Sequence, residues 1–166
     1  MSRGFVKEED QEDIPIVLPR AHLPNGVTNY VTQVGMDELL EEKQMLINSR
    51  DHLGNTNENE RRIELNHINA KLELLNDRIS TAKIVDLKKQ PQNEISFGAT
   101  VTLKITSQAI LQRYQIVGVD EADISKGKIS FISPIARILM NKKIGEKPIF
   151  KIAEEERVFE IMEITY

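Results

Sequence analysis

The strongest structural signal in this chain is a run of apolar residues at steps of three and four positions between residues 65 and 82. This spacing places six side chains on one stripe of a helix, as at the seam of a coiled coil. A looser version of the pattern covers residues 36–53. A helix with so narrow an apolar stripe can bury it only against a partner helix. The nearest partner for each of these two segments is the other segment. The sequence therefore predicts two antiparallel helices, at about 36–53 and 60–85, in a coiled-coil hairpin domain of residues 30–86. The stripe positions are Met36, Leu39, Leu40, Leu46, Ile47 and Leu53 in the first arm and Leu65, Ile68, Leu72, Leu75, Ile79 and Ala82 in the second.

The segment between the two arms, residues 54–60, contains no apolar residue and is rich in turn formers. It carries two carboxylates, Glu58 and Glu60. At ~1.5 Å per residue, arms of this length project roughly 30 Å. The spacing alone leaves two interpretations open. The hairpin is either a dimerisation coiled coil or bundle fragment, or a finger that carries acidic groups at its tip into a cavity.

Composition limits the classes of protein that this chain can belong to. The 166 residues are 40% hydrophobic and carry a formal net charge of -4. A chain of this size holds one ordinary domain, or a small domain plus a long hairpin. A mildly acidic chain does not wrap nucleic acid well, so we expect nucleic-acid contact only indirectly, through a protein partner. The absence of cysteine excludes disulfides and thiolate metal sites. Without a long apolar run or a secretory signal, a cytoplasmic protein with no membrane contact is expected.

The first 29 residues read as an extension without a core of its own. An acidic cluster comes first, and three prolines then interrupt any helix or central strand. A loosely attached tail is favoured, although a few apolar residues allow part of the segment to lie against a domain. The residues concerned are the acidic Glu8, Glu9, Asp10, Glu12 and Asp13, the prolines Pro15, Pro19 and Pro24, and the apolar Ile14, Ile16, Val17 and Leu18.

Short alternating runs typical of β-strands begin after a polar linker at residues 87–94. Ser133 suits a helix N-cap and Pro134 suits the first helical position, so a short helix is expected there. The predicted fold class is therefore α+β, with the helical hairpin followed by a compact antiparallel sheet domain with one short helix over residues 95–166. The strands are expected at residues 100–105, 113–117, 128–132, 148–152 and 157–164.

Two sequence segments are specific enough to point to a family. Residues 114–123 read Tyr-Gln-Ile-Val-Gly-Val-Asp-Glu-Ala-Asp, and residues 129–136 read Ile-Ser-Phe-Ile-Ser-Pro-Ile-Ala. They follow Ile-Val-Asp at residues 84–86 and Phe-Gly-Ala-Thr-Val-Thr-Leu at residues 97–103. In this order and spacing the segments resemble the bacterial Gre transcription elongation factors, the GreA/GreB family. The resemblance covers about residues 30–166.

The resemblance implies an N-terminal coiled-coil finger and a C-terminal domain of FKBP-like fold. In this family the C-terminal domain docks at the rim of the secondary channel of RNA polymerase, and the finger enters the channel. Tip acids then help to hold a second Mg²⁺ in the polymerase active site, where the metal activates water to cleave backtracked RNA. Hard carboxylate oxygens suit Mg²⁺, which needs only one or two protein ligands. The chain would be an accessory factor with no catalytic site of its own, and would share Mg²⁺ with the polymerase rather than bind a cofactor stably.

The resemblance also assigns site residues. The family's second tip acid corresponds to Glu58, its first acid is replaced by Asn55, and Glu60 is a further candidate ligand. Polymerase docking is implied for Asp120, Glu121, Asp123, Ser133 and Pro134, and RNA or polymerase contacts for Arg50, Arg61 and Arg62. For these other assigned residues, an interpretation without the resemblance is also open: a helix cap for Ser133 and Pro134, a solvated turn for the acids at 120–123, and the polar side of an exposed coiled coil for the arginines.

Two departures from the family pattern concern the finger. The amide of Asn55 carries no charge, and the arms are shorter than usual by about one heptad, which is ~10 Å of reach. A channel-binding transcription regulator without cleavage activity is therefore an open alternative. A prolyl isomerase, suggested by fold alone, and a coiled-coil interaction scaffold that dimerises through the seam are further alternatives. We expect a monomer whose partner is RNA polymerase.

Overall fold

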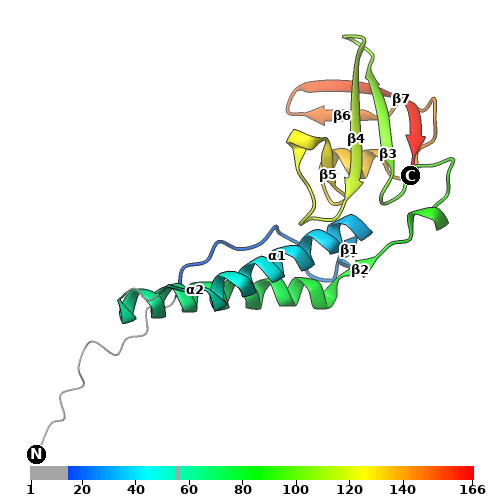
Figure 1. Cartoon of the computed structure of the whole chain (residues 1–166). Coiled ribbons are helices and arrows are strands. Elements are labelled where there is room, and N and C mark those ends of the chain that lie inside the picture. Colours follow the sequence, from blue (N-terminus) through cyan, green and yellow to red (C-terminus); the bar gives the residue numbers. More distant parts are fainter. Residues whose placement is uncertain (1–14, 55–56) are drawn as a thin grey trace, which may run out of the picture.

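The computed structural model describes residues 15–54 and 57–166, which form a helical hairpin and a sheet domain (Figure 1). The hairpin consists of α1 (Gln33–Asp51) and α2 (Glu58–Thr81). The two helices lie side by side and project away from the sheet domain (Figure 1). Two short strands, β1 (Tyr30–Val31) and β2 (Lys83–Ile84), pair in parallel at the base of the hairpin. The predicted helical hairpin is confirmed.

Side-chain caps set where both helices begin. α1 begins at Gln33, three residues before the expected start, because Thr32 Oγ1 accepts a hydrogen bond from the backbone N–H of Gly35 at 2.9 Å. α2 begins at Glu58, two residues early, because the side chain of Asn57 accepts a bond from the backbone at 3.1 Å. The caps lengthen both helices at their N-termini relative to the apolar pattern.

The expected continuation of the second helix to residue 85 is wrong, because α2 ends at Thr81. Asn29 meets the helix end from outside, where its side chain donates to the carbonyl of Arg78 at 2.9 Å and to Thr81 Oγ1 at 3.2 Å. Its own carbonyl accepts from the N–H of Lys83 at 2.8 Å. These bonds satisfy groups that a helix end leaves unpaired, and they direct the chain into β2.

The seam between the helices is buried as the spacing predicts. Ile68, Leu72 and Leu75 of α2 are buried, and Leu39 of α1 faces them. Leu40 was expected in the stripe but is 47% exposed, because adjacent helix positions point ~100° apart and Leu39 already occupies the inner face. At the base, Val31, Leu39 and Leu75 form a small core flanked by Met36, Leu46, Ile79 and Ala82.

The C-terminal part of the chain forms a five-stranded sheet with the strand order β5-β4-β3-β7-β6. Neighbouring strands are antiparallel except β4 and β5, which pair in parallel, so the sheet is mixed rather than wholly antiparallel. The fold class is α+β. The strands are β3 (Thr100–Ile105), β4 (Ile110–Val117), β5 (Lys128–Ser130), β6 (Ile149–Ile152) and β7 (Glu155–Thr165), and 3₁₀ turns occur at Leu87–Lys89 and Ile124–Lys126.

One short helix, α3 (Pro134–Leu139), packs against this sheet. It begins where the sequence predicts, since Ser133 is its N-cap and Pro134 occupies its first position. Ala136 and Leu139 are fully buried in the core. Among the helices of the described residues, none has the length and apolarity to cross a bilayer.

Candidate functional site

The tip of the hairpin presents exposed carboxylates. Glu58 and Glu60 lie in the first turn of α2 and are exposed. Because two positions along an α-helix correspond to ~200° about its axis, the two side chains leave on different sides. Asn55 lies outside the described residues. Within residues 15–54 and 57–166, no three or more His, Asp or Glu side chains gather to hold a metal ion, so the described part of the chain does not form a magnesium site by itself.

The arginines assigned to RNA or polymerase contacts lie near the same end of the hairpin. Arg61 and Arg62 are exposed on α2, and Arg50 is partly exposed near the end of α1. Arg50 contacts its neighbour Asp51 at 3.3 Å, an exposed pair that contributes little to stability. Contact of these three arginines with RNA or polymerase stays a prediction.

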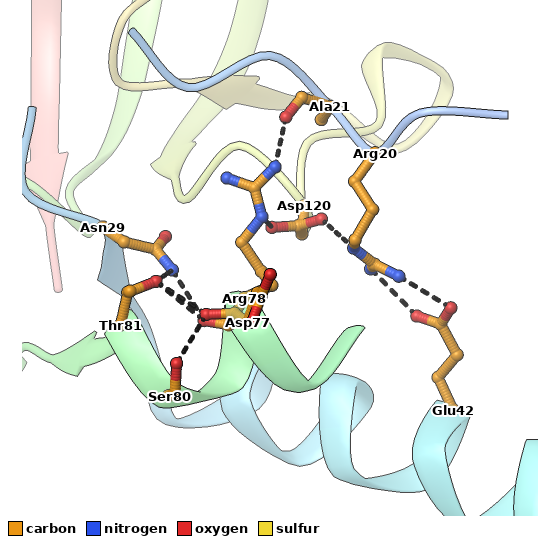
Figure 2. Close-up of polar contacts among 9 residues, drawn as sticks. All are labelled: Arg20, Ala21, Asn29, Glu42, Asp77, Arg78, Ser80, Thr81 and Asp120. Atoms are coloured by element: carbon orange, nitrogen blue, oxygen red, sulfur yellow. Dashed lines mark hydrogen bonds and ion pairs between the residues drawn. The ribbon is translucent and has the colours of Figure 1, made fainter. Parts of the chain in front are cut away.

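Asp120 lies at the centre of an ion-pair network that joins the two parts of the molecule (Figure 2). Its Oδ1 accepts a hydrogen bond from Arg20 Nε at 2.9 Å, and its Oδ2 lies 2.9 Å from Arg78 Nε. The Arg20 guanidinium also donates two parallel bonds to Glu42 of α1, at 2.9 and 3.0 Å, and Arg78 donates to the carbonyl of Ala21. The side chains of Asp120, Arg20 and Arg78 are only 7%, 18% and 13% exposed, so these three charges are largely buried, whereas Glu42 is 45% exposed.

The network shows that residues 15–29, called the strap below, are not a loosely attached tail. The strap runs beside the hairpin and returns to β1 (Figure 1). Arg20 links it to α1 and the sheet domain, and buried Asn29 links it to the end of α2. The hydrogen bonds that Arg20 donates to Glu42, together with the charge of Asp120, raise the pKa of Arg20 above its ordinary value. The acidic cluster at residues 8–13 lies outside the described residues.

Glu121 forms a second contact between the two parts. Its buried carboxylate accepts a hydrogen bond from Thr32 Oγ1 at 2.5 Å and pairs with Lys128 Nζ at 2.9 Å. Lys128 also lies 3.7 Å from Glu38 of α1. Burial alone would lower the pKa of Lys128, but the hydrogen bond and charge of Glu121 outweigh it and raise that pKa. The single hydroxyl of Thr32 thus caps α1 by accepting from Gly35 and also donates a hydrogen bond to Glu121 of the sheet domain.

Backbone groups approach closely at the same contact. A Cβ on Gly118 would lie 2.6 Å from the carbonyl oxygen of Tyr30, so this approach requires glycine. The Tyr30 ring packs against Phe97 and Phe131, with centroids 5.8 and 5.9 Å apart. The base of the hairpin therefore rests on the sheet domain through apolar, polar and backbone contacts together.

The residues assigned to polymerase docking divide into inward and outward groups. Asp120 and Glu121 are buried in the pairs described above, so the alternative of a solvated turn is wrong for them. Asp123 is partly exposed, and the Ser125 hydroxyl donates to it at 2.5 Å and lowers its pKa. Ser133 caps α3, and Pro134 is exposed beside it. Docking through these positions stays a prediction.

Sequence reasoning missed Arg20, Glu42 and Lys128, which complete the contact between the two parts. A signal for Arg20 was present. It is the only Asp, Glu, Lys or Arg between residues 14 and 36, and a lone cation in an apolar, proline-rich stretch indicates a buried partner. Glu42 and Lys128 lie among many charged residues and have no comparable signal.

Replacing Gly35 by alanine should destabilise the protein although alanine favours helices. A Cβ at this position would lie 2.6 Å from Glu121 Oε2, so the buried carboxylate must leave Thr32. We expect the free energy of unfolding in urea to fall by about 2 kcal/mol, the cost of an unsatisfied buried polar group less the helix gain. Gly54→Ala meets no atom within 4 Å and is the matched control. A Gly35→Ala variant as stable as the parent would contradict the tight packing.

A comparison with known protein families matches residues 90–166 to the C-terminal domain of the transcription elongation factors GreA and GreB. The GreA of Hyphomonas neptunium is 36% identical over 99 residues, which is 60% of this chain and 63% of that protein. The GreA of Halorhodospira halophila is 37% identical over 128 residues, which is 74% of this chain and 80% of that protein. The match to the first relative thus spans less than two thirds of that protein's length, whereas the match to the second spans 80% of its length.

Among solved structures, the GreA factor homologue Gfh1 of Thermus thermophilus is similar over 84% of this chain and all of its own, with 18% identity and a TM-score of 0.41. The sequence relatives carry the family relationship.

Proposed function

This chain belongs to the GreA/GreB transcription elongation factor family, and we propose that it is a transcription elongation factor that binds bacterial RNA polymerase. In this proposal the sheet domain docks at the rim of the secondary channel and the hairpin enters the channel as a finger. The single observation that carries it is a hairpin with an exposed acidic tip projecting from a sheet domain that matches the family (Figure 1). The factor is an accessory protein acting in the cytoplasm on the polymerase active site.

Dimensions and packing of the hairpin support a finger rather than a scaffold. The 19 residues of α1 correspond to ~28 Å of helix, enough to carry the tip well clear of the sheet domain. The seam residues of α2, Ile68, Leu72 and Leu75, are already buried within the chain, so this seam offers no free apolar face for dimerisation. A monomer is therefore the proposed active form.

Stimulation of transcript cleavage is the first candidate activity of the finger. Since the described tip residues do not hold a metal alone, Glu58 would supply one carboxylate to an ion whose other ligands belong to the polymerase. Glu60 points to another side of α2 and would contact the channel wall. The nucleic acid is then reached only through the transcription complex.

Channel occupancy without cleavage is the second candidate, and a specific observation favours it. Glu58 and Glu60 stand two positions apart on α2, so they cannot both face one ion. The position that supplies the family's other tip acid holds the neutral Asn55. A finger of this kind would regulate transcription by occupying the channel.

A cleavage assay on a backtracked elongation complex of the cognate polymerase separates the two activities. If the tip supplies a ligand, Glu58→Gln should lower the cleavage rate by about tenfold or more, because the amide lacks the charge that draws the ion. Glu64→Gln, an exposed carboxylate further along α2, is the matched control.

Binding of each variant to the polymerase is measured in parallel. Cleavage that depends on Glu58 supports the first activity, and tight binding without any cleavage supports the second. If the parent protein does not bind the polymerase, the proposed function is wrong.

A further inference from the structure

The strap contacts two parts of the molecule through one side chain. Arg20 donates two bonds to Glu42, on the third turn of α1, and one bond to Asp120 of the sheet domain (Figure 2). The bidentate pair fixes the orientation of the guanidinium as well as its position. Arg20 is 18% exposed and Asp120 7%, so salt screens this bond less than it screens a surface pair. Glu42 is 45% exposed, so its pair with Arg20 is screened more than the bond to Asp120.

The position of Glu42 along the finger gives the link mechanical leverage. The other contacts of β1 and α1 to the sheet domain lie nearer the hairpin base, around Tyr30, Thr32 and Gly35, and the one furthest along is Glu38, 3.7 Å from Lys128 Nζ. Glu42 is seven residues beyond Gly35 and four beyond Glu38, which is ~10 Å and ~6 Å further along the helix axis. A rigid rod held only at its base pivots there, whereas a second attachment further along the rod opposes that rotation.

The partners around Asp120 show why Arg20 carries this attachment. Arg78 lies 2.9 Å from Oδ2, but without the alignment of a hydrogen bond, and within the described residues Oδ2 has no hydrogen-bond partner. The directed bond to the carboxylate therefore comes from Arg20. Arg78 lies in the last turn of α2, close to the hairpin base, so its pair with Asp120 adds little leverage.

We propose that Arg20 is a positioning residue, and that the strap fixes the direction of the finger relative to the sheet domain through it. The structural part stands on the contacts above, and its effect on cleavage rests on the proposed function. In a docked factor a fixed direction aims the tip along the channel. Without the link, the finger samples several directions and the tip is correctly placed for a smaller share of the time.

The direction of the finger is measured by the distance between two spin labels in the full-length chain. The protein has no cysteine, so labels attach only to introduced ones. Glu64→Cys on α2 and Lys147→Cys on the sheet domain are exposed positions. Pulsed electron paramagnetic resonance then gives the distribution of distances between the two parts, with no polymerase present.

We expect one narrow distance distribution for the labelled parent and a clearly broader one for both Arg20→Gln and Glu42→Gln. Glu42→Gln leaves the bond between Arg20 and Asp120 in place, so broadening in this variant isolates the attachment to the finger. Arg50→Gln, which removes an exposed arginine from its pair with Asp51, should leave the distribution unchanged. A distribution as narrow as the parent's in both test variants would overturn the proposal.

A second readout addresses the consequence for activity. If the tip stimulates cleavage, Arg20→Gln should lower the cleavage rate at saturating factor by about tenfold, the effect of losing ~1.4 kcal/mol of preference for one direction. Its affinity for the polymerase should stay within about twofold, because Asp120 faces inward and the outward docking positions Asp123, Ser133 and Pro134 are unchanged. Equal cleavage rates for the two proteins would overturn the role in cleavage. A parent without any cleavage refutes that activity separately, and the label distances then decide the structural proposal.

Discussion

Replacing Asp120 by asparagine is expected to lower the free energy of unfolding by about 3 kcal/mol, near the lower end of the cost of breaking a buried ion pair. The change keeps the size of the side chain but removes the charge between two arginines. Arg20 retains Glu42 in this variant, whereas Arg78 retains only the carbonyl of Ala21. Both arginine side chains are largely buried, so the cost falls mainly on Arg78. Urea unfolding followed by circular dichroism gives the measurement.

The matched control for Asp120→Asn is Asp51→Asn, which removes the same charge from an exposed pair with Arg50. Exposed pairs contribute about 0–1 kcal/mol, so the control should differ little from the parent. Because Asp120 joins the two parts of the molecule, its variant should also unfold over a broader range of urea as the hairpin and the sheet domain separate. Equal losses in the two variants would show that Asp120 is no more than a surface charge.

Local patterns in the sequence predicted most of the fold. The three-and-four spacing of apolar residues identified the hairpin. Clean alternation of apolar and polar residues predicted a strand at residues 100–105, and β3 has these bounds. Ser133 and Pro134 identified the start of α3 because cap and first-turn preferences depend only on adjacent backbone groups. Such features can be read locally, since the physical cause lies within a few residues.

The errors arose where distant segments meet. α2 ends at Thr81 because Asn29, far away in the sequence, bonds its last turn. The strap is attached because Arg20 reaches Asp120, one hundred residues further along the chain. Neither contact produces a periodic pattern of residues in the sequence from which it could be predicted. The composition of residues 1–29 suggested a tail since it contains no core of its own, yet buried ion pairs and hydrogen bonds hold its described part.

The sequence singled out Asp120, Glu121 and Asp123 but did not predict which way their side chains point. The segment 114–123 carries the family resemblance, and sequence could select its acids as notable. Beyond β4, which ends at Val117, strand alternation no longer says which way a side chain points. The structure turns Asp120 and Glu121 inward toward the hairpin and leaves Asp123 partly exposed. Buried acids of this kind hold the two parts together, whatever partner the outward residues contact.

Truncating Leu75 to alanine should have the largest effect on the hairpin, lowering the free energy of unfolding by about 3 kcal/mol. Leu75 is fully buried and packs with Val31 and Leu39 in a core that has few other members. Removal of three of its four side-chain carbons leaves a cavity that so small a core cannot refill. Val31 is adjacent to Tyr30, whose carbonyl oxygen lies close to Gly118 of the sheet domain. Loss of the Leu75 side chain therefore also loosens the contact between the hairpin base and the sheet domain.

Leu74→Ala is the control for this truncation, because it removes the same atoms one position along the helix. Leu74 is 38% exposed, so its loss should cost no more than ~1 kcal/mol. The two variants have equal helix propensity, and the difference between them in urea therefore reports burial alone. If they lost equal stability, the seam would contribute nothing beyond the helices' own preference, and the finger would not be a rigid rod whose direction a single arginine could fix.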